Sequence, residues 1–464
     1  MMIALALLTT GTAWAEDLPK DSLKVVDIEE VVVIAAPKEN RKLRELPTAT
    51  TLLSQQDMQA NQVQSVKNLT GIVPNLFIPD YGSKLTTSIY IRGIGSRINT
   101  PSVGLYVDNI PYIDKSAFDF NYADIERIDI LRGPQGTLYG RNTMGGLIKV
   151  HTKSPFTYQG TDIRMGAATY NNYNVSLTHY HRISDRFAFS TGGFYEHAGG
   201  FFENMTRNNE KVDKSNAGGG RFRGIYMPTS NLKIDMTLNY EYGDQGGYPY
   251  EYTGVTQGEE TRPEYIGKIA NNERSGYRRG LLNSGINIEY QARNFILSAV
   301  TGYQNLNDRM FLDQDFTEKD IYTLEQKQRA NTISEEITFK SKPGNNWQWA
   351  TGVSGFYQWL HTTGPVQFGQ EGVRSVIEDN ANEQFENITA GNPRAPKMHM
   401  NINNQGLAVG GSFDTPILNG AIFHQSTFNN LFIKGLSATV GLRLDYEKLK
   451  MDYNSVSDPL NFDF

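Results

Sequence analysis

Closely spaced glycines are the first residues of this chain that could do chemistry, because a glycine-rich loop can cradle a phosphate with its backbone N–H groups. Such a loop needs Gly-x-x-x-x-Gly-Lys-Ser/Thr between a strand and a helix, whereas Gly136 to Arg141 has neither the spacing nor the lysine. Gly93 and Gly95 lack the third glycine and the acidic residue of a dinucleotide fingerprint. The glycines therefore indicate sharp turns rather than nucleotide binding.

Cysteine and histidine, which often supply nucleophiles and metal ligands, give little support to either chemistry. The chain has no cysteine, so thiolate catalysis, disulfides and cysteine metal sites are excluded. Among the 7 histidines, His179 and His181 would share one strand face, but no carboxylate stands beside them at a ligand-like spacing. No nucleophile, base and orienting residue stand together in a motif. We therefore expect no enzyme, no metal site and no cofactor.

The composition narrows the class of protein further. The chain has 464 residues, of which 39% are hydrophobic and 11% aromatic, with a mean hydropathy of −0.47. A bundle of membrane helices is excluded, because each span needs about 20 mostly apolar residues and no such run occurs. A transmembrane β-barrel needs apolar residues only at alternate positions. The formal charge of −6 provides no basic surface for nucleic acid.

Alternation of apolar and polar residues dominates the chain after Gly160. The clearest segments are 232–242, 347–359 and 436–447, each with apolar residues on one strand face and polar residues on the other. Alternation also fits a soluble β-sandwich with one wet face. Short turns at 184–186, 228–231, 291–294 and 343–346 alternate with long polar connections at 204–216, 243–275, 308–328 and 362–419. This asymmetry favours a transmembrane antiparallel β-barrel over the sandwich.

Three motifs in the first third of the chain carry a family resemblance. They are S-I-Y-I-R-G-I-G-S-R at 88–97, P-S-V-G-L-Y-V-D-N-I-P at 101–111, and the glycine-punctuated run from Asp124 to Lys153. In this order they closely resemble the plug domain of TonB-dependent outer-membrane receptors, and the likeness extends from about Asp27 to Pro155. The resemblance implies a small mixed α/β plug domain inside a transmembrane β-barrel. It also implies a siderophore-receptor-like transporter rather than an enzyme.

The expected domains follow from these patterns together with the resemblance. Residues 1–15 resemble a secretory signal peptide with cleavage after Ala15, although no Lys or Arg precedes Glu16; a short buried helix is the alternative. Residues 16–36 would form a periplasmic segment, 37–155 the plug domain and 160–464 a partial transmembrane β-barrel. About eleven barrel strands can be counted, whereas such barrels close with an even number and the family has about twice as many. We expect an incomplete barrel that alone neither inserts stably nor transports, because unpaired strand edges in lipid are costly.

The segment 27–37 is an apolar, β-branched run that ends at a proline, and it could add as a strand to an exposed sheet edge. By resemblance it occupies the position of the TonB box, where the inner-membrane TonB complex binds and pulls. The alternative is that it forms the first strand of the plug. The residues expected to bind TonB are Glu30, Val31, Val32, Val33 and Ile34.

Two further groups of site residues are expected. Arg92, Arg132 and Arg141 each adjoin a glycine of the plug motifs and could pair with barrel carboxylates as a latch between plug and barrel, with Glu336 as the best candidate partner. For contact with the ligand, aromatic and charged residues of the predicted loops are candidates. These are Asp80, Tyr81, Lys84, Arg97, Asn99, Tyr248, Tyr250 and Tyr252.

The expected function is uptake of a ferric siderophore or similar iron complex across the outer membrane of a Gram-negative bacterium, with TonB, membrane lipid and a small-molecule ligand as partners. The cargo rests on the frequency of such receptors in the family, since no residue pattern coordinates iron. Cobalamin or glycan import is the alternative within the family. A non-transporting product of an interrupted gene is the alternative outside it. We expect no nucleic-acid partner.

Overall fold

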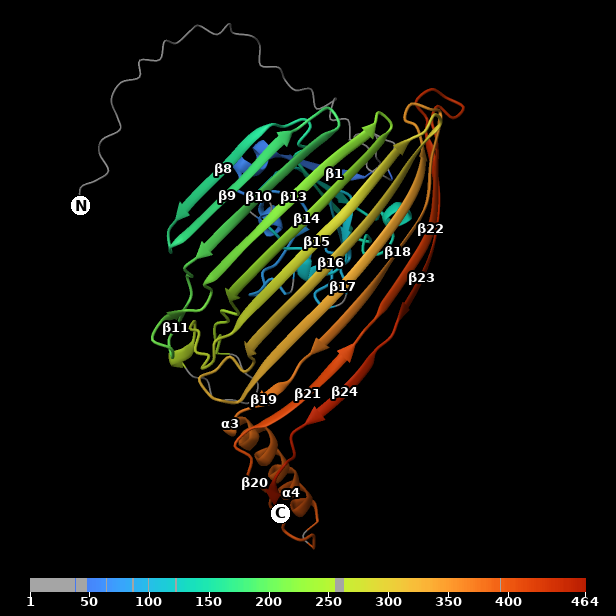
Figure 1. Ribbon diagram of the computed structural model, residues 1–464. Helices are drawn as coiled ribbons and strands as arrows, with labels where there is room; N and C mark the ends of the chain where they lie inside the picture. The colour runs from blue at the N-terminus through green and yellow to red at the C-terminus, as the bar shows by residue number, and fades with distance from the viewer. Residues whose placement is uncertain are drawn as a thin grey trace, which may run out of the picture.

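The computed structural model describes Lys38 and residues 48–464, apart from 64, 86, 99, 122, 255–262 and 393. A small mixed domain comes first and lies against the concave side of a large curved antiparallel sheet (Figure 1). The expected signal peptide and the expected TonB-binding residues Glu30, Val31, Val32, Val33 and Ile34 lie outside the described residues. So does Asn99.

The small domain has a five-stranded sheet in the order β1-β6-β7-β4-β5, in which β4 and β7 are parallel. Its strands are β1 (Ala49–Ser54), β4 (Val103–Val107), β5 (Ile110–Tyr112), β6 (Ile125–Arg132) and β7 (Gly146–Thr152), with β2 (Leu76–Phe77) and β3 (Tyr90–Ile91) pairing separately. Its helical turns are α1 (Gln55–Ala60), η3 (Val66–Gly71), η4 (Lys115–Ala117) and α2 (Gly136–Tyr139). Apolar residues of β4, β6 and β7 form a core that continues into Leu281, Leu306 and Ala330 of the large sheet.

The predicted capping signature at Ser54 begins a helix. The Ser54 backbone N–H donates to Asp57 Oδ2 at 2.9 Å, and the Asp57 N–H donates to Ser54 Oγ at 3.2 Å, so each residue caps the other. The turn between β4 and β5 consists of Asp108 and Asn109, which have φ of 47° and 71°. Two successive left-handed residues suit the tight hairpin that points Asp108 toward the large sheet.

The large sheet, over the described residues, contains 14 strands. Its main strands are β8 (Gly160–Ala168), β9 (Asn172–Arg182), β10 (Phe187–Ala198), β13 (Ser215–Thr229), β14 (Leu232–Gly246), β15 (Gly276–Gln291), β16 (Phe295–Asp313), β17 (Tyr322–Ser341), β18 (Trp347–Thr363), β22 (Ile417–Phe428) and β23 (Ala438–Leu449). Three shorter strands continue these lines at one end: β19 (Val366–Phe368), β21 (Leu407–Asp414) and β24 (Asp452–Ser457). Pro365 and Pro416 stand at two of the breaks, because proline cannot donate to the ladder.

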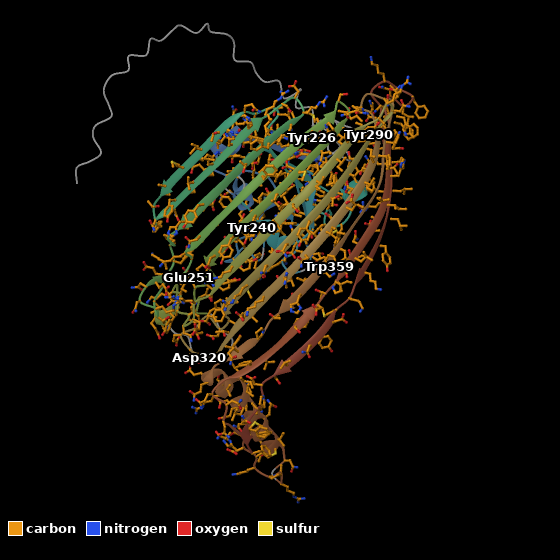
Figure 2. The ribbon with its side chains drawn as sticks, in the orientation of Figure 1. Tyr226, Tyr240, Glu251, Tyr290, Asp320 and Trp359 are labelled. Carbon is orange, nitrogen blue, oxygen red and sulfur yellow. The ribbon has the colours of Figure 1, made fainter. Side chains whose placement is uncertain are left out.

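The alternation predicted for 232–242 is confirmed along β14. Asp235, Thr237, Asn239 and Glu241 are buried on the concave face, while Met236, Leu238, Tyr240 and Tyr242 are about half exposed on the convex face. Figure 2 shows Tyr226, Tyr240, Tyr290 and Trp359 on the outside of the sheet, with Tyr226 and Tyr290 at its short-turn end. An apolar outer face with aromatic residues near its ends is typical of a barrel wall in lipid.

The loops follow the predicted asymmetry with two corrections. The connection expected at 308–328 is short, because β16 extends to Asp313 and β17 begins at Tyr322. The connection expected as a polar loop at 362–419 is structured. It contains α3 (Gln370–Gly372), η6 (Val373–Glu378), α4 (Asp379–Gly391) and β20 (Asn401–Ile402), which pairs with β25 (Phe462–Asp463). A small cluster around Val373, Ile402 and Leu407 provides the core that its mostly polar sequence concealed.

The remaining described elements are short. The connection between β10 and β13 contains β11 (Glu203–Asn204) paired with β12 (Glu210–Lys211), and the connection between β14 and β15 contains η5 (Pro263–Tyr265). Among the described helices, none is both long enough and apolar enough to cross a membrane.

A charge on the convex face tests its contact with lipid. Leu238 lies at the middle of β14 and is 49% exposed there. Leu238→Arg should lower the free energy of unfolding in bilayers by about 2 to 4 kcal/mol, whereas Tyr290→Arg at the short-turn end should cost about 0 to 1 kcal/mol, because lipid penalises charge according to depth. Guanidinium titration in phospholipid vesicles measures both. Equal costs at the two positions would count against a lipid-facing wall.

Candidate functional site

Two arginines on the concave face of β13 hold the small domain to the large sheet. The Arg221 guanidinium donates to Asp108 Oδ2 at 2.5 Å and to Asp124 Oδ1 at 3.1 Å, and all three side chains are at least nine-tenths buried. Thr152 at the end of β7 joins the same network, since its N–H and hydroxyl donate to the Asp108 carboxylate at 2.9 and 2.7 Å. The hairpin turn, the end of β7 and β13 therefore meet at one ionic cluster.

Arg223, two residues further along β13, extends this cluster. Its guanidinium forms a bidentate pair with Asp235 of β14 at 3.0 and 2.7 Å, and its remaining nitrogen donates to the Thr152 carbonyl at 3.0 Å. Arginine suits this position because its planar fork can satisfy a carboxylate and a carbonyl together. Burial alone would raise the pKa of Asp108, but Arg223 and Arg221 hold it well below its usual value. Asp108 is therefore ionised at neutral pH, and the cluster remains paired.

A second cluster lies nearer the long-loop end. Arg279 of β15 donates to Glu241 of β14 at 2.5 Å and to the backbone carbonyl of Asp119 at 2.7 Å. Glu241 also accepts from Lys84 at 3.4 Å and from the backbone N–H of Asn121 at 3.1 Å. The segment that includes Asp119 and Asn121 is thus tied to the inner face of the sheet by Glu241 and its arginine, and by Glu196 of β10, which accepts from the Asn121 side chain at 2.7 Å.

Shape complements these ionic contacts. Gly285 of β15 and Gly302 of β16 face Ile110 of the small domain, and a Cβ at Gly285 would overlap the Ile110 side chain. A Cβ at Gly302 would lie 3.0 Å from Ile110 Cγ2. The two glycines therefore form a seat for Ile110 in the wall, where any larger residue would push the small domain away.

The arginines predicted as a latch meet different partners from the one expected. Arg141 does reach a carboxylate of the large sheet, but it is Glu447 of β23, at 2.7 Å. Arg132 donates to the Pro74 carbonyl at 3.1 Å, and Arg92 has a positive φ of 53° in the turn after β3. Arg141 and Arg132 therefore pair with Glu447 and the Pro74 carbonyl instead of Glu336. A role of these residues as a latch stays a prediction.

Glu336 instead pairs with Lys38, which sequence reasoning did not single out. The Lys38 ammonium is 4% exposed and lies over the rings of Tyr106, Tyr139 and Phe423, at 5.6, 4.7 and 5.6 Å from their centres. Burial lowers the pKa of Lys38, and the neighbouring Glu336 opposes this shift. Lys38 thus fixes the start of the small domain to β17 and to aromatic residues of both parts.

A cavity of about 610 Å³ lies at the long-loop end, between the small domain and β10, β13, β14 and β15. Asp80, Lys84 and Tyr250 of the predicted ligand contacts line it. Tyr81 and Arg97 lie beside it: the Arg97 guanidinium is 4.4 Å from the centre of the Tyr81 ring, and Tyr250 donates to the Tyr81 carbonyl. These contacts bring five of the predicted residues to one place.

Two predicted tyrosines are placed differently. Tyr248 is buried and donates to Ser83 Oγ at 2.9 Å, and burial raises its pKa to about 12. It packs with Tyr277, Met310 and Leu312, so it supports the loop rather than facing the cavity. Tyr252 forms an isolated bridge with Ile266 further along the same connection. Their contact with a ligand remains a prediction, as does that of Asn99, which lies outside the described residues.

A sequence comparison identifies the small domain. Residues 42–147 match the TonB-dependent Receptor Plug Domain family. The chain carries a TonB-dependent receptor plug domain. The resemblance drawn from its three motifs is therefore confirmed, and the clusters around Arg221 and Arg279 join this plug to the inner face of the barrel sheet.

Relatives known by sequence are receptors and transporters. The pesticin receptor of Yersinia pestis is 30% identical over 149 residues, which is 32% of this chain and 22% of that protein. The vitamin B12 transporter BtuB of Vibrio vulnificus is 28% identical over 216 residues, 44% of this chain and 32% of that protein. The aligned parts thus span no more than about a third of either relative.

Solved structures share the architecture of this chain. The ferric yersiniabactin uptake receptor FyuA from Yersinia pestis superposes with a TM-score of 0.62 at 14% identity, covering 91% of this chain and 63% of that one. The unliganded ferric citrate transporter FecA gives 0.55 at 13% identity, covering 88% and 61%. These likenesses show the fold: an antiparallel transmembrane β-barrel sheet around a plug domain. The chain spans less than two thirds of each of these receptors.

Charged residues that face the barrel lumen are the part of the site that sequence reasoning missed. They lie on the polar, lumen-facing side of β13, β14 and β15 and are Arg221, Arg223, Asp235, Glu241 and Arg279. A search for charges at those positions would have found them, because a lumen filled by a plug leaves few such charges without a plug partner. The sequence could not say which plug residue each one meets.

Proposed function

We propose that this chain forms the plug and part of the barrel of a TonB-dependent transporter at the outer membrane of a Gram-negative bacterium, which takes up a ferric siderophore or similar iron complex. The observation that carries the proposal is the position of the plug. It is fastened to the concave face of the barrel sheet directly beside a cavity that opens among the long loops. A ligand held there can pass inward only when the plug rearranges.

The proposed mechanism needs no covalent chemistry. Ligand binds in the cavity against Asp80, Lys84 and Tyr250, and the segment with Val32 becomes available to TonB as an added strand. TonB, driven by the proton-motive force, pulls on this segment, and the work of pulling must separate plug groups from the wall. Beside the cavity, these are the hydrogen bonds of Asn121 to Glu241 and Glu196 and of Arg279 to the Asp119 carbonyl.

One relative supports an iron chelate as the cargo, and another supports cobalamin instead. A ferric yersiniabactin receptor shares the fold over 91% of the chain. Cobalamin is a second candidate, because the vitamin B12 transporter aligns over 216 residues, more than the 149 of the pesticin receptor. Both cargoes are small molecules and would use the same cavity and the same coupling to TonB.

Uptake measurements distinguish the two cargoes. Cells that depend on this gene should accumulate radioactive iron from a ferric chelate, and accumulation should fall to background when the gene is deleted or an uncoupler removes the proton-motive force. Cobalamin uptake should be unchanged by the deletion. Loss of cobalamin uptake with unchanged iron uptake would replace the iron assignment by the cobalamin one, and no effect on either would contradict the transporter.

A further inference from the structure

The charges that line the external cavity define the class of ligand it can accept. Five acidic and three basic side chains line it, a formal excess of two negative charges: Asp80, Asp119, Glu196, Asp213 and Asp244 against Lys67, Lys84 and Arg279. Building on the proposed function, we infer that this cavity selects a neutral or positively charged metal chelate that presents hydrogen-bond donors, and rejects polyanionic chelates.

The basic side chains of the cavity are already neutralised by carboxylates of the protein. Lys67 lies 3.3 Å from Asp80 Oδ2 and 3.4 Å from Asp119 Oδ2. Lys84 and Arg279 share Glu241, at 3.4 and 2.5 Å. Arg279 is only 1% exposed, so its charge is directed into the protein. An anionic ligand would have to displace one of these carboxylates before it gained a cation.

Two of the acidic groups, by contrast, are held by uncharged donors. Glu196 accepts from the Asn121 amide at 2.7 Å, and Asp213 accepts from the backbone N–H groups of Phe201 and Phe202 at 2.8 to 3.0 Å. Asp119 Oδ1 is buried and has no hydrogen-bond partner among the described residues. The Asp119 side chain is 4% exposed, so this oxygen is a buried acceptor beside the cavity that a donor on a ligand could satisfy.

Iron chelates of different chemical classes differ in net charge, so the charge of the cavity favours one class over another. Three hydroxamates, each with one negative charge, neutralise Fe³⁺, and a free ammonium makes such a complex cationic. Three catecholates, each with two negative charges, leave the complex strongly anionic. A cavity that is negative and partly buried repels the second class and attracts the first, and this repulsion contributes more to selectivity than to the affinity for the correct ligand.

Charged thiol reagents test the potential of the cavity without reference to any ligand. The chain has no cysteine, so Ser215→Cys and, separately, Tyr250→Cys place a single thiol on two walls of the cavity. In the full chain in detergent micelles, a cationic methanethiosulfonate should modify each thiol faster than an anionic one. The rate with the cationic reagent divided by the rate with the anionic reagent should be about tenfold higher than at the control position. Tenfold is the lower end of the rate enhancements that charged clefts produce by electrostatic focusing.

The control is the same substitution at the other end of the same strand. Ser230→Cys lies in the exposed turn after β13 and reports the intrinsic rates of the two reagents. Adding Glu196→Gln to Ser215→Cys should lower the ratio severalfold. A ratio at Ser215→Cys equal to or below that at Ser230→Cys would overturn the inference, and it would leave the transporter assignment untouched.

Binding of matched chelates then tests the ligand class. Quenching of the intrinsic fluorescence should show that a ferric trihydroxamate binds at least tenfold more tightly than a ferric tricatecholate, and that Glu196→Gln with Asp213→Asn narrows the difference. Tighter binding of the tricatecholate would overturn the inference. Binding of cobalamin alone would overturn the proposed iron cargo, while the reagent ratios would still decide the charge of the cavity.

Discussion

Val32→Pro will reduce energy-dependent uptake to background in cells that rely on this receptor, and binding of ligand at the cell surface will stay unchanged. The reason is the geometry of strand addition. Proline removes one backbone donor from the ladder and fixes φ near −65°, so the segment around Val32 can no longer pair along its length with TonB. The ligand cavity is built from residues from Lys67 onward, far along the chain from Val32, and keeps its contacts. Binding of labelled chelate to whole cells and its accumulation with time measure the two steps separately.

A matched control is Leu23→Pro, nine residues upstream in the polar segment before the expected TonB-binding residues. This variant should import at the normal rate, because it introduces the same residue without interrupting the pairing segment. Normal import by Val32→Pro would mean that TonB engages another part of the chain. Loss of surface binding together with import would mean that this segment supports the plug itself, which is the alternative considered from its β-branched sequence.

The fold was accessible from the sequence because one rule dominates a barrel wall. Each strand between lipid and lumen must alternate, and residues 232–242 of β14 do so at every position. The plug was accessible for another reason: its glycine-rich motifs at 88–97, 101–111 and 124–153 are local and ordered. The structured insertion between β18 and β22 was not, because α4 buries none of its residues and Phe385 and Ile388 are its only large apolar side chains.

The candidate site was accessible only in part, for a physical reason. Loop residues such as Asp80, Lys84 and Tyr250 converge because the loops that carry them all end on the same side of the barrel. Partners across the plug and wall depend on the register of the plug inside the barrel, which no local pattern encodes. Glu336 was recognised as a lumen-facing carboxylate, but its partner proved to be Lys38, almost 300 positions away.

Arg223→Met will produce the largest loss of stability among substitutions of the described residues argued above, about 3 to 5 kcal/mol. Removing one member of a buried ion pair leaves the other charge without compensation. Here both Arg223 and Asp235 are 7% exposed, and the same guanidinium also supports the Thr152 carbonyl of the plug. Guanidinium titration in detergent micelles measures the loss. Proteolysis of the plug, which should become faster as its contact with β13 weakens, provides an independent measurement.

Two further variants separate the ion pair from the loss of side-chain volume. Arg223→Met combined with Asp235→Leu should regain most of the stability, because replacing a whole buried pair by apolar residues is often neutral or stabilising. Arg141→Ala breaks the pair between Arg141 and Glu447, whose side chains are 20% and 38% exposed, respectively. Because this pair is partly exposed, its loss should lower the free energy of unfolding by less than about 1 kcal/mol. If Arg223→Met costs no more than Arg141→Ala, the cluster on β13 does not fasten the plug. If the double variant is no more stable than Arg223→Met, the loss comes from the contact with Thr152, and the plug depends on that hydrogen bond rather than on the charge of Asp235.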